Sequence, residues 1–346
     1  MNLRTVEPAT AAEPTRHRRT VGPMVGIVLA VVAVQAVLFT LFAWPALHSE
    51  PRDLPIVVAG PAPAAHHLAG QLDQARPGAF DVDTVADAAA ADRALRDRDA
   101  YGAFIVDRDG VRLHVASAAA PQIAQLLREV ARAAGAQTGS HVAVTDVVPT
   151  DPDDPHGVVP SIGILPLVMT SMLAGILLGL AIRSRWWRLA GVLSYSVLAG
   201  LASTAIGQYW LAALPGSYLR TAAVVALLAV AVAGTMSGLV AVLRVRGAGL
   251  GVAVMFVLGI PLAGLTTAPA LLPAGWGELG QLLPPGAAGT LLRSVVYFDS
   301  AGAGAPLAVL AGWAALGLVL LLAARTKRSL AHPAETPSPT PPGPDL

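Results

Sequence analysis

The sequence predicts an all-α membrane protein with six transmembrane helices and an inserted external α/β domain. Its 346 residues are 54% hydrophobic and only 13% charged, whereas soluble domains carry about 25% charged residues. Two stretches, 160–182 and 247–277, contain no Asp, Glu, Lys or Arg. Long uncharged apolar stretches of this kind are typical of membrane spans.

Six apolar stretches are each near the ~20 residues that cross ~30 Å of hydrocarbon. They cover residues 22–47, 160–182, 189–213, 221–243, 248–272 and 305–324. The first resembles a cleaved signal peptide, but its apolar stretch is far longer than the ~7–15 residues of a signal core. We therefore expect it to remain as an anchor.

The basic residues next to the spans are distributed unequally between the two sides. Those on one side are Arg4, Arg16, Arg18, Arg19, Arg183, Arg185, Arg188, Arg244, Arg246, Arg325, Lys327 and Arg328, whereas the short loops opposite hold only Arg220 and Arg293. The positive-inside rule then predicts cytoplasmic tails at 1–21 and 326–346, the second disordered. Together with a composition rich in Ala, Gly and Pro, this suggests a multi-pass protein of a bacterial cell membrane.

Residues 48–159 form the expected external α/β domain and its linker. Strand patterns at 54–60, 80–85, 101–106, 111–116 and 142–148 alternate with helix patterns in the order β-α-β-α-β-β-α-β. Asp109-Gly110 is a hairpin-turn signal between two of the strands. This order predicts a mixed sheet covered by helices, and about 100 residues are enough for an independent core.

The sequence offers no catalytic, metal-binding or cofactor-binding constellation. It contains no cysteine, and the adjacent His66 and His67 cannot both face one site on a helix. Asp81 with Asp83, and Asp107 with Asp109, are better explained as solvated strand ends and turns. There is no phosphate-binding loop, and a net charge of +1 favours no nucleic-acid partner. We expect neither an enzyme nor a cofactor.

The predicted spans contain small residues such as Gly, Ser and Ala, and no charged residues. In the third span Ser196, Gly200, Ser203 and Gly207 share one helical face, and small residues allow close helix packing. We favour packing over a substrate path for this face, which could also serve self-association. No ionisable side chain falls in a predicted span core, so the spans offer no obvious binding residue for a coupling ion.

Residues 273–304 predict a re-entrant or interfacial hairpin within the membrane region 160–325. Pro284, Pro285 and Gly286 lead into a helical pattern at 287–298 that is too short to span. The same segment carries Arg293, Tyr297 and Phe298. A re-entrant segment needs cover from protein or water.

Three groups of residues, in this order along the chain, resemble those of a known family. They are 54–60 with 94–106 and 113–118, then 146–157 leading into the second span, and 282–287 with 293–298 before the last span. The chain resembles the permease subunits of type-2 ABC exporters, in the subgroup related to the phage infection protein. The resemblance implies a homodimeric six-helix permease in the lipid bilayer, with ATP hydrolysis on separate subunits.

The cytoplasmic loop between the second and third spans is short. Exporters of this class usually carry a longer segment there, and this chain has only Arg183, Ser184, Arg185, Trp186, Trp187 and Arg188. We expect an ATPase to dock at its Arg and Trp residues. The predicted function is a permease-like subunit of an ATP-driven exporter. The alternative is a non-transporting surface protein whose external domain binds a partner or serves envelope assembly or secretion.

Overall fold

The computed structural model describes residues 18–108, 110–139 and 142–324. Within them, six helical stretches are long and apolar enough to cross a membrane: Met24–Pro45, Val159–Ala181, Arg185–Trp210, Tyr218–Leu243, Val245–Leu262 and Gly304–Ala323. The predicted number of candidate spans is therefore confirmed for the described chain. The predicted tails lie outside the described residues, apart from 18–21.

Five of the helical stretches form a bundle around α8 (Tyr218–Leu243). It packs against α6 (Ile164–Ala181), α7 (Arg185–Ala205) and α13 (Gly304–Ala323). Small residues create this closeness: a Cβ on Gly175 of α6 would lie 2.6 Å from the Ala233 carbonyl oxygen of α8. Gly238 of α8 meets Leu320 of α13 in the same way.

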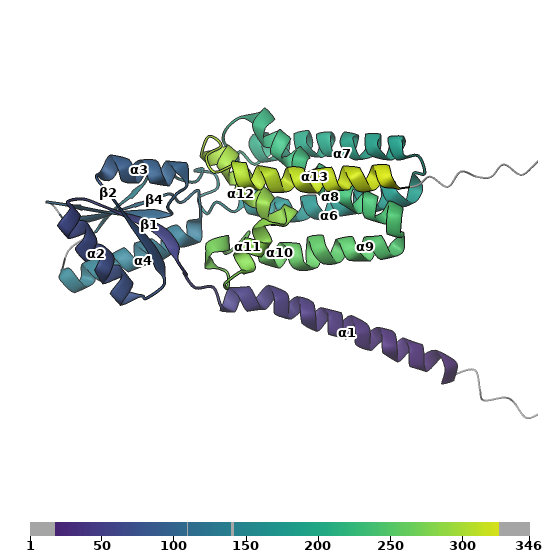
Figure 1. Ribbon diagram of the computed structural model, residues 1–346, viewed down its shortest axis with the longest axis horizontal. Helices are drawn as coiled ribbons and strands as arrows, with labels where there is room; N and C mark the ends of the chain where they lie inside the picture. The colour runs from purple at the N-terminus through teal and green to yellow at the C-terminus, as the bar shows by residue number, and fades with distance from the viewer. Residues whose placement is uncertain (1–17, 109, 140–141, 325–346) are drawn as a thin grey trace, which may run out of the picture.

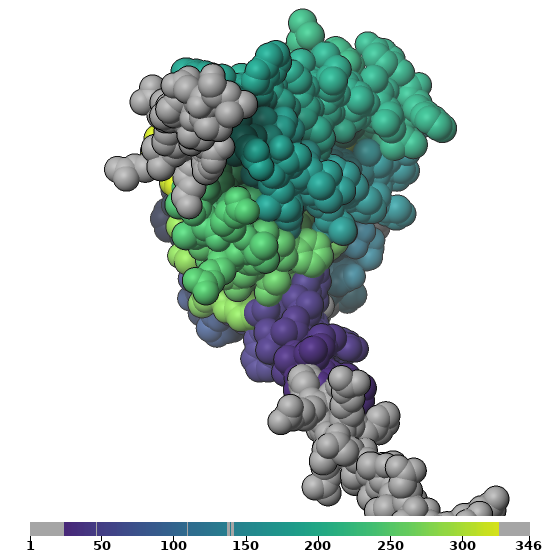
Figure 2. All heavy atoms as spheres, turned by 90° about the vertical axis from the view of Figure 1, so that its right-hand side faces the viewer, coloured from purple at the N-terminus to yellow at the C-terminus, as the bar shows by residue number. Residues whose placement is uncertain are grey.

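The first span stands apart from the bundle. Helix α1 (Arg18–Leu47) diverges from the other helices in Figure 1, and in the end-on view of Figure 2 it lies at their edge. None of its most apolar stretch is buried within the chain. It touches the bundle near its C-terminal end, where the ring of Phe42 lies 6.4 Å from that of Phe256.

The fifth span is shorter than the sequence predicts. It consists of α9 (Val245–Val252), a π-helical stretch η2 (Ala253–Leu258) and α10 (Gly259–Leu262), and so ends ten residues before position 272. The chain then reverses through Gly264 and Ala268, at φ values of +62° and +68°. Hydropathy could not show this, because residues 263–272 continue the span without any charged side chain.

Between α1 and α5 (Val159–Ile162) lies a five-stranded mixed sheet, which we call the sheet unit together with its helices. The strands run in the order β2-β1-β3-β4-β5, with β3 and β4 antiparallel and the other neighbours parallel. Their bounds are Leu54–Ala59, Phe80–Val85, Gly102–Asp107, Gly110–Val115 and Ala143–Asp146 for β1 to β5. Helices α2 (Ala62–Ala75), α3 (Ala88–Asp97) and α4 (Pro121–Thr138) complete the predicted element order.

The sheet unit does not close its core with its own residues alone. Ala268 and Leu271, from the segment after the fifth span, belong to the apolar cluster that includes Leu54 and Ile123. Phe298 belongs to a second cluster, with Ala91 and Leu95 of α3. Two segments from the far end of the sequence are therefore built into the sheet unit, which sits at one end of the bundle (Figure 1).

Candidate functional site

Helix α12 (Pro284–Tyr297) links the sheet unit to the bundle. Two prolines in its first turn favour initiation there, because a helix leaves those N–H groups unpaired anyway. Leu291, Leu292, Val295 and Val296 are buried in the apolar core that α12 shares with α6, α8 and α13. The predicted short helix is thus present, and other parts of the protein cover it.

Arg293 of α12 holds three separate parts of the chain together. Its guanidinium donates hydrogen bonds to the carbonyl oxygens of Ala118, in the sheet unit, and Gly157, in the linker, at 3.1 and 3.0 Å. A third, of 2.8 Å, goes to the hydroxyl of Ser161 in α5. A rigid fork of five N–H donors suits arginine to this role.

Arg98 of the sheet unit also connects the sheet unit to α12. It caps the C-terminus of α3 in the left-handed region, at φ +66°, where glycine is the usual residue. Its Nη1 donates to the Thr290 carbonyl oxygen at 3.1 Å and to Ser294 Oγ at 2.7 Å. The guanidinium carbon lies 5.1 Å from the centre of the Phe298 ring. A strained backbone here places a cation against α12.

Positive charge is in excess at this junction. Within the described chain, neither guanidinium lies within 4.0 Å of a carboxylate oxygen. The buried Asp154 acts on Arg293 only at longer range, because its own oxygens accept the N–H groups of Val158 and Val159 at 3.0 and 2.8 Å.

Burial sets the protonation of the groups around the junction. It lowers the pKa of both Arg98 and Arg293, yet an arginine stays charged near neutral pH. Burial also raises the pKa of the Tyr101 phenol, which stays neutral and able to donate. The site therefore holds two cations beside neutral hydrogen-bonding groups.

These groups line a cavity of about 180 Å³, which we call the junction pocket. Its polar walls include Arg98, Tyr101, Gln122, Gln281, Thr290 and Arg293. Internal hydrogen bonds fix two of the amides: Thr290 Oγ1 donates to Gln281 Oε1 at 2.7 Å, and Gln122 Nε2 donates to the Thr266 carbonyl oxygen at 2.7 Å. The cavity is thus a preorganised, cationic space between the sheet unit and the bundle.

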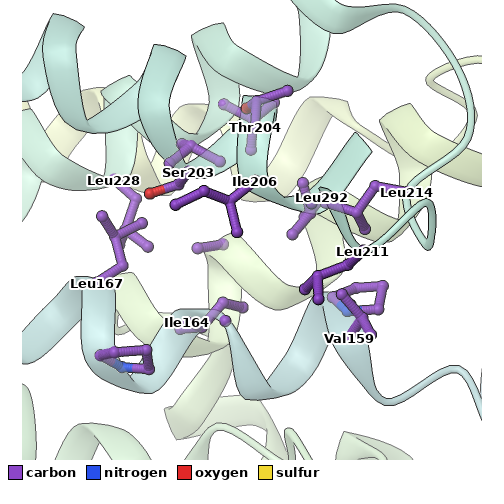
Figure 3. Close-up of a pocket in the computed structure, with 17 residues that line it drawn as sticks. Val159, Ile164, Leu167, Ser203, Thr204, Ile206, Leu211, Leu214, Leu228 and Leu292 are labelled. Atoms are coloured by element: carbon purple, nitrogen blue, oxygen red, sulfur yellow. The ribbon is translucent and has the colours of Figure 1, made fainter. Parts of the chain in front are cut away.

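A second cavity, the apolar pocket, lies within the bundle beside another face of α12. Its volume is about 240 Å³. Figure 3 shows Ile164, Leu167, Leu228 and Leu292 around it, with the hydroxyl of Ser203 at its wall. The π-helical stretch η1 (Ile206–Trp210) at the end of α7 forms part of the lining, and such bulges are frequent at functional sites.

The predicted small-residue face of the third span divides between two roles. Ser196 is fully buried, and a Cβ on Gly200 would lie 2.5 Å from the Ala222 carbonyl oxygen of α8. Gly207 packs on Leu214, and Ser203 lines the apolar pocket. Helix α8 of the same chain packs on the part of this face that holds Ser196 and Gly200. These two residues therefore cannot serve self-association.

The predicted docking loop is only partly available. Trp186 and Trp187 are 62% and 73% exposed, and the guanidinium of Arg185 lies 5.5 Å from the centre of the Trp186 ring. Arg188, in contrast, is buried and donates two hydrogen bonds, of 3.2 and 2.6 Å, to the Ile182 carbonyl oxygen. It closes the C-terminal end of α6, so the docking role predicted for Arg188 does not fit its position.

Sequence reasoning identified part of the junction. The hairpin residues Arg293, Tyr297 and Phe298 all lie there, and Pro284, Pro285 and Gly286 begin α12. Arg98 was missed, because it is one of several arginines in a polar stretch of the sheet unit. A basic residue where a helix would end with glycine was the only signal for it.

Comparisons of this chain with protein-family models, with curated proteins and with solved structures give no match.

Proposed function

We propose that the chain is a permease-like subunit of an ATP-driven exporter, with ATP hydrolysis on a separate chain. The observation that carries the proposal is the apolar pocket, a cavity of about 240 Å³ inside a bundle of candidate membrane spans. One of its walls is α12, the same short helix that Arg98 and Arg293 fasten to the sheet unit. A movement of the bundle would thus reach the sheet unit through one rigid element.

The orientation we propose puts the sheet unit outside the cell. The described ends of α1 and α13 lie at the end of the bundle opposite the sheet unit (Figure 1). That end also carries the basic loops with Arg183, Arg185, Arg244 and Arg246. The positive-inside rule favours a cytoplasmic position for it, and with it for both termini.

An ATPase is proposed as partner because the chain has no phosphate-binding loop of its own. The exposed Trp186 and Trp187, with Arg185 over the Trp186 ring, offer the surface for it. Exposed aromatic and arginine side chains are the types most enriched at interface hot spots. A homodimer is proposed from the resemblance to type-2 ABC exporters.

Purification from the native host in mild detergent tests the proposal. We expect a nucleotide-hydrolysing chain to co-purify, and the Trp186→Ala/Trp187→Ala variant to lose it while the Trp210→Ala variant, altered at the end of η1, retains it. If no such chain co-purifies, even after crosslinking in the membrane, the exporter proposal is rejected. The surface-protein alternative then becomes the better one.

A further inference from the structure

The junction pocket adjoins a third cavity, the α1 groove, whose chemistry is different. The α1 groove has a volume of about 270 Å³ and is lined mostly by apolar side chains, including Phe42 and Pro45 of α1, Leu165 of α6 and Ile260 of α10. Both cavities are lined by Ser161, Gly264 and Leu265. A cationic space and an apolar one therefore meet at the same residues.

The α1 groove is placed to receive molecules from the bilayer. Helix α1 meets the bundle near Phe42 and Pro45, and diverges from it towards its N-terminus (Figure 1). No partner segment within the described chain covers its apolar stretch. A hydrocarbon chain could thus lie between α1 and α6 without first crossing water.

The junction pocket in turn favours an anion. Two guanidiniums line it, and no carboxylate in the described chain pairs with either. Asp154 acts on Arg293 only at longer range. Partly buried charges without a directly paired opposite charge are costly, and arginine is well matched to phosphate oxygens. Tyr101 and Gln122 add neutral groups for the remaining polar atoms of a headgroup.

We propose that the junction pocket and the α1 groove together bind an anionic phospholipid, with its phosphate at Arg98 and Arg293 and an acyl chain along α1 against Leu165. A zwitterionic lipid fits less well, because its headgroup carries a positive charge and positive charge is already in excess at the junction. This inference does not depend on the proposed export function, since a bound lipid can equally stabilise the junction of a surface protein.

Lipid titration of the full chain, followed by native mass spectrometry, tests the inference. The probes are phosphatidylglycerol, phosphatidylcholine and inorganic phosphate, each added to delipidated protein in detergent. We expect phosphatidylglycerol to bind at least about tenfold more tightly than phosphatidylcholine, because the choline cation of phosphatidylcholine is repelled by the two guanidiniums. Equal binding of the two lipids would overturn the proposal.

Two variants localise the site. Arg98→Gln/Arg293→Gln should lose the preference for phosphatidylglycerol. Arg93→Gln/Arg132→Gln, which removes the same charge from exposed positions of α3 and α4, should keep it. A preference that survives the first change, or is lost with the second, contradicts a site at the junction.

A third variant separates a lipid from a free phosphate, and it leaves both arginines in place. Leu165→Trp narrows the α1 groove at a position that is 38% exposed, so the bundle core should tolerate it. We expect it to weaken phosphatidylglycerol binding by about tenfold and to leave inorganic phosphate binding unchanged. If instead inorganic phosphate competes fully and Leu165→Trp has no effect, the ligand is a soluble anion and the lipid proposal is wrong.

Discussion

Arg98 Nη1 donates a hydrogen bond of 2.7 Å to Ser294 Oγ, joining two residues that are 196 positions apart in the chain. The donor ends a helix of the sheet unit, and the acceptor lies in α12 beside Arg293. This contact and the three hydrogen bonds of Arg293 make the sheet unit and α12 one mechanical unit.

Replacing Arg293 should loosen that unit. Arg293→Gln removes hydrogen bonds to three different segments, and bonds from a charged donor contribute roughly 1.5–3 kcal/mol each. We expect a clear fall in the thermal unfolding midpoint in detergent. Arg293→Lys should be intermediate, because an ammonium keeps the charge but not the planar fork. Arg132→Gln, at an exposed position, is the control; an equal fall there would argue against a special role for Arg293.

The backbone at Arg98 allows a separate test. Arg98→Gly and Arg98→Ala lose the same side-chain contacts, but only alanine keeps the penalty of the left-handed conformation at φ +66°. Arg98→Gly should therefore be the more stable of the two by about 1 kcal/mol. Thermal unfolding of both variants measures the difference, and an alanine variant as stable as the glycine variant would show that the strain is absent.

Close packing on α8 makes a third prediction. In Gly175→Ala the new Cβ would lie 2.6 Å from both the Ala233 carbonyl oxygen and Met236 Cβ, so the two helices must separate. We expect a loss of about 1–3 kcal/mol, as for other overpacked cores. Gly312→Ala, on α13, meets nothing within 4 Å and should be neutral or slightly stabilising. Unfolding midpoints that respond alike to both changes would contradict the observed packing.

Alkaline pH should weaken the junction through Tyr297. Burial, reinforced by Asp154, raises the pKa of Tyr297 to about 12, above the ~10 of an unfolded tyrosine. The folded state thus favours the protonated phenol, and this stabilisation is fully present below pH ~10 and is lost as the pH rises towards about 12. The unfolding midpoint should fall less steeply over this window in Tyr297→Phe than in the unaltered protein. Parallel curves would exclude Tyr297 as the responsible group.

Features that depend on neighbouring residues could be predicted from the sequence, whereas features that depend on distant contacts could not. The number of candidate spans and the element order of the sheet unit follow from the local pattern of hydrophobic residues, and both were predicted. The end of the fifth span was not, because Ala268, Ala270 and Leu271 are apolar for their packing in the core of the sheet unit, and hydropathy does not distinguish that from a membrane span. The completion of the sheet unit's core by Leu271 and Phe298 joins residues that are far apart in the chain, which no local pattern records.

The residues of the candidate site also differ in how far the sequence could predict them. Arg293 could be singled out because it is a lone cation in an apolar hairpin. Arg98 could not, because one arginine among several in a polar stretch has no distinguishing neighbour in sequence. Arg188 was assigned to a partner because its loop is basic, whereas in the structure the Ile182 carbonyl oxygen is its acceptor.

The most direct test of the account is whether the sheet unit and the loop at Arg183–Arg188 lie on opposite sides of the membrane. The chain contains no cysteine, so single cysteines can be introduced without any background. Arg132→Cys, in α4, and Arg185→Cys, at the start of α7, would be treated in intact cells with a membrane-impermeant maleimide. We predict labelling of Arg132→Cys in intact cells, and of Arg185→Cys only after the membrane is permeabilised. Labelling of both positions, or of Arg185→Cys alone, in intact cells would contradict the account.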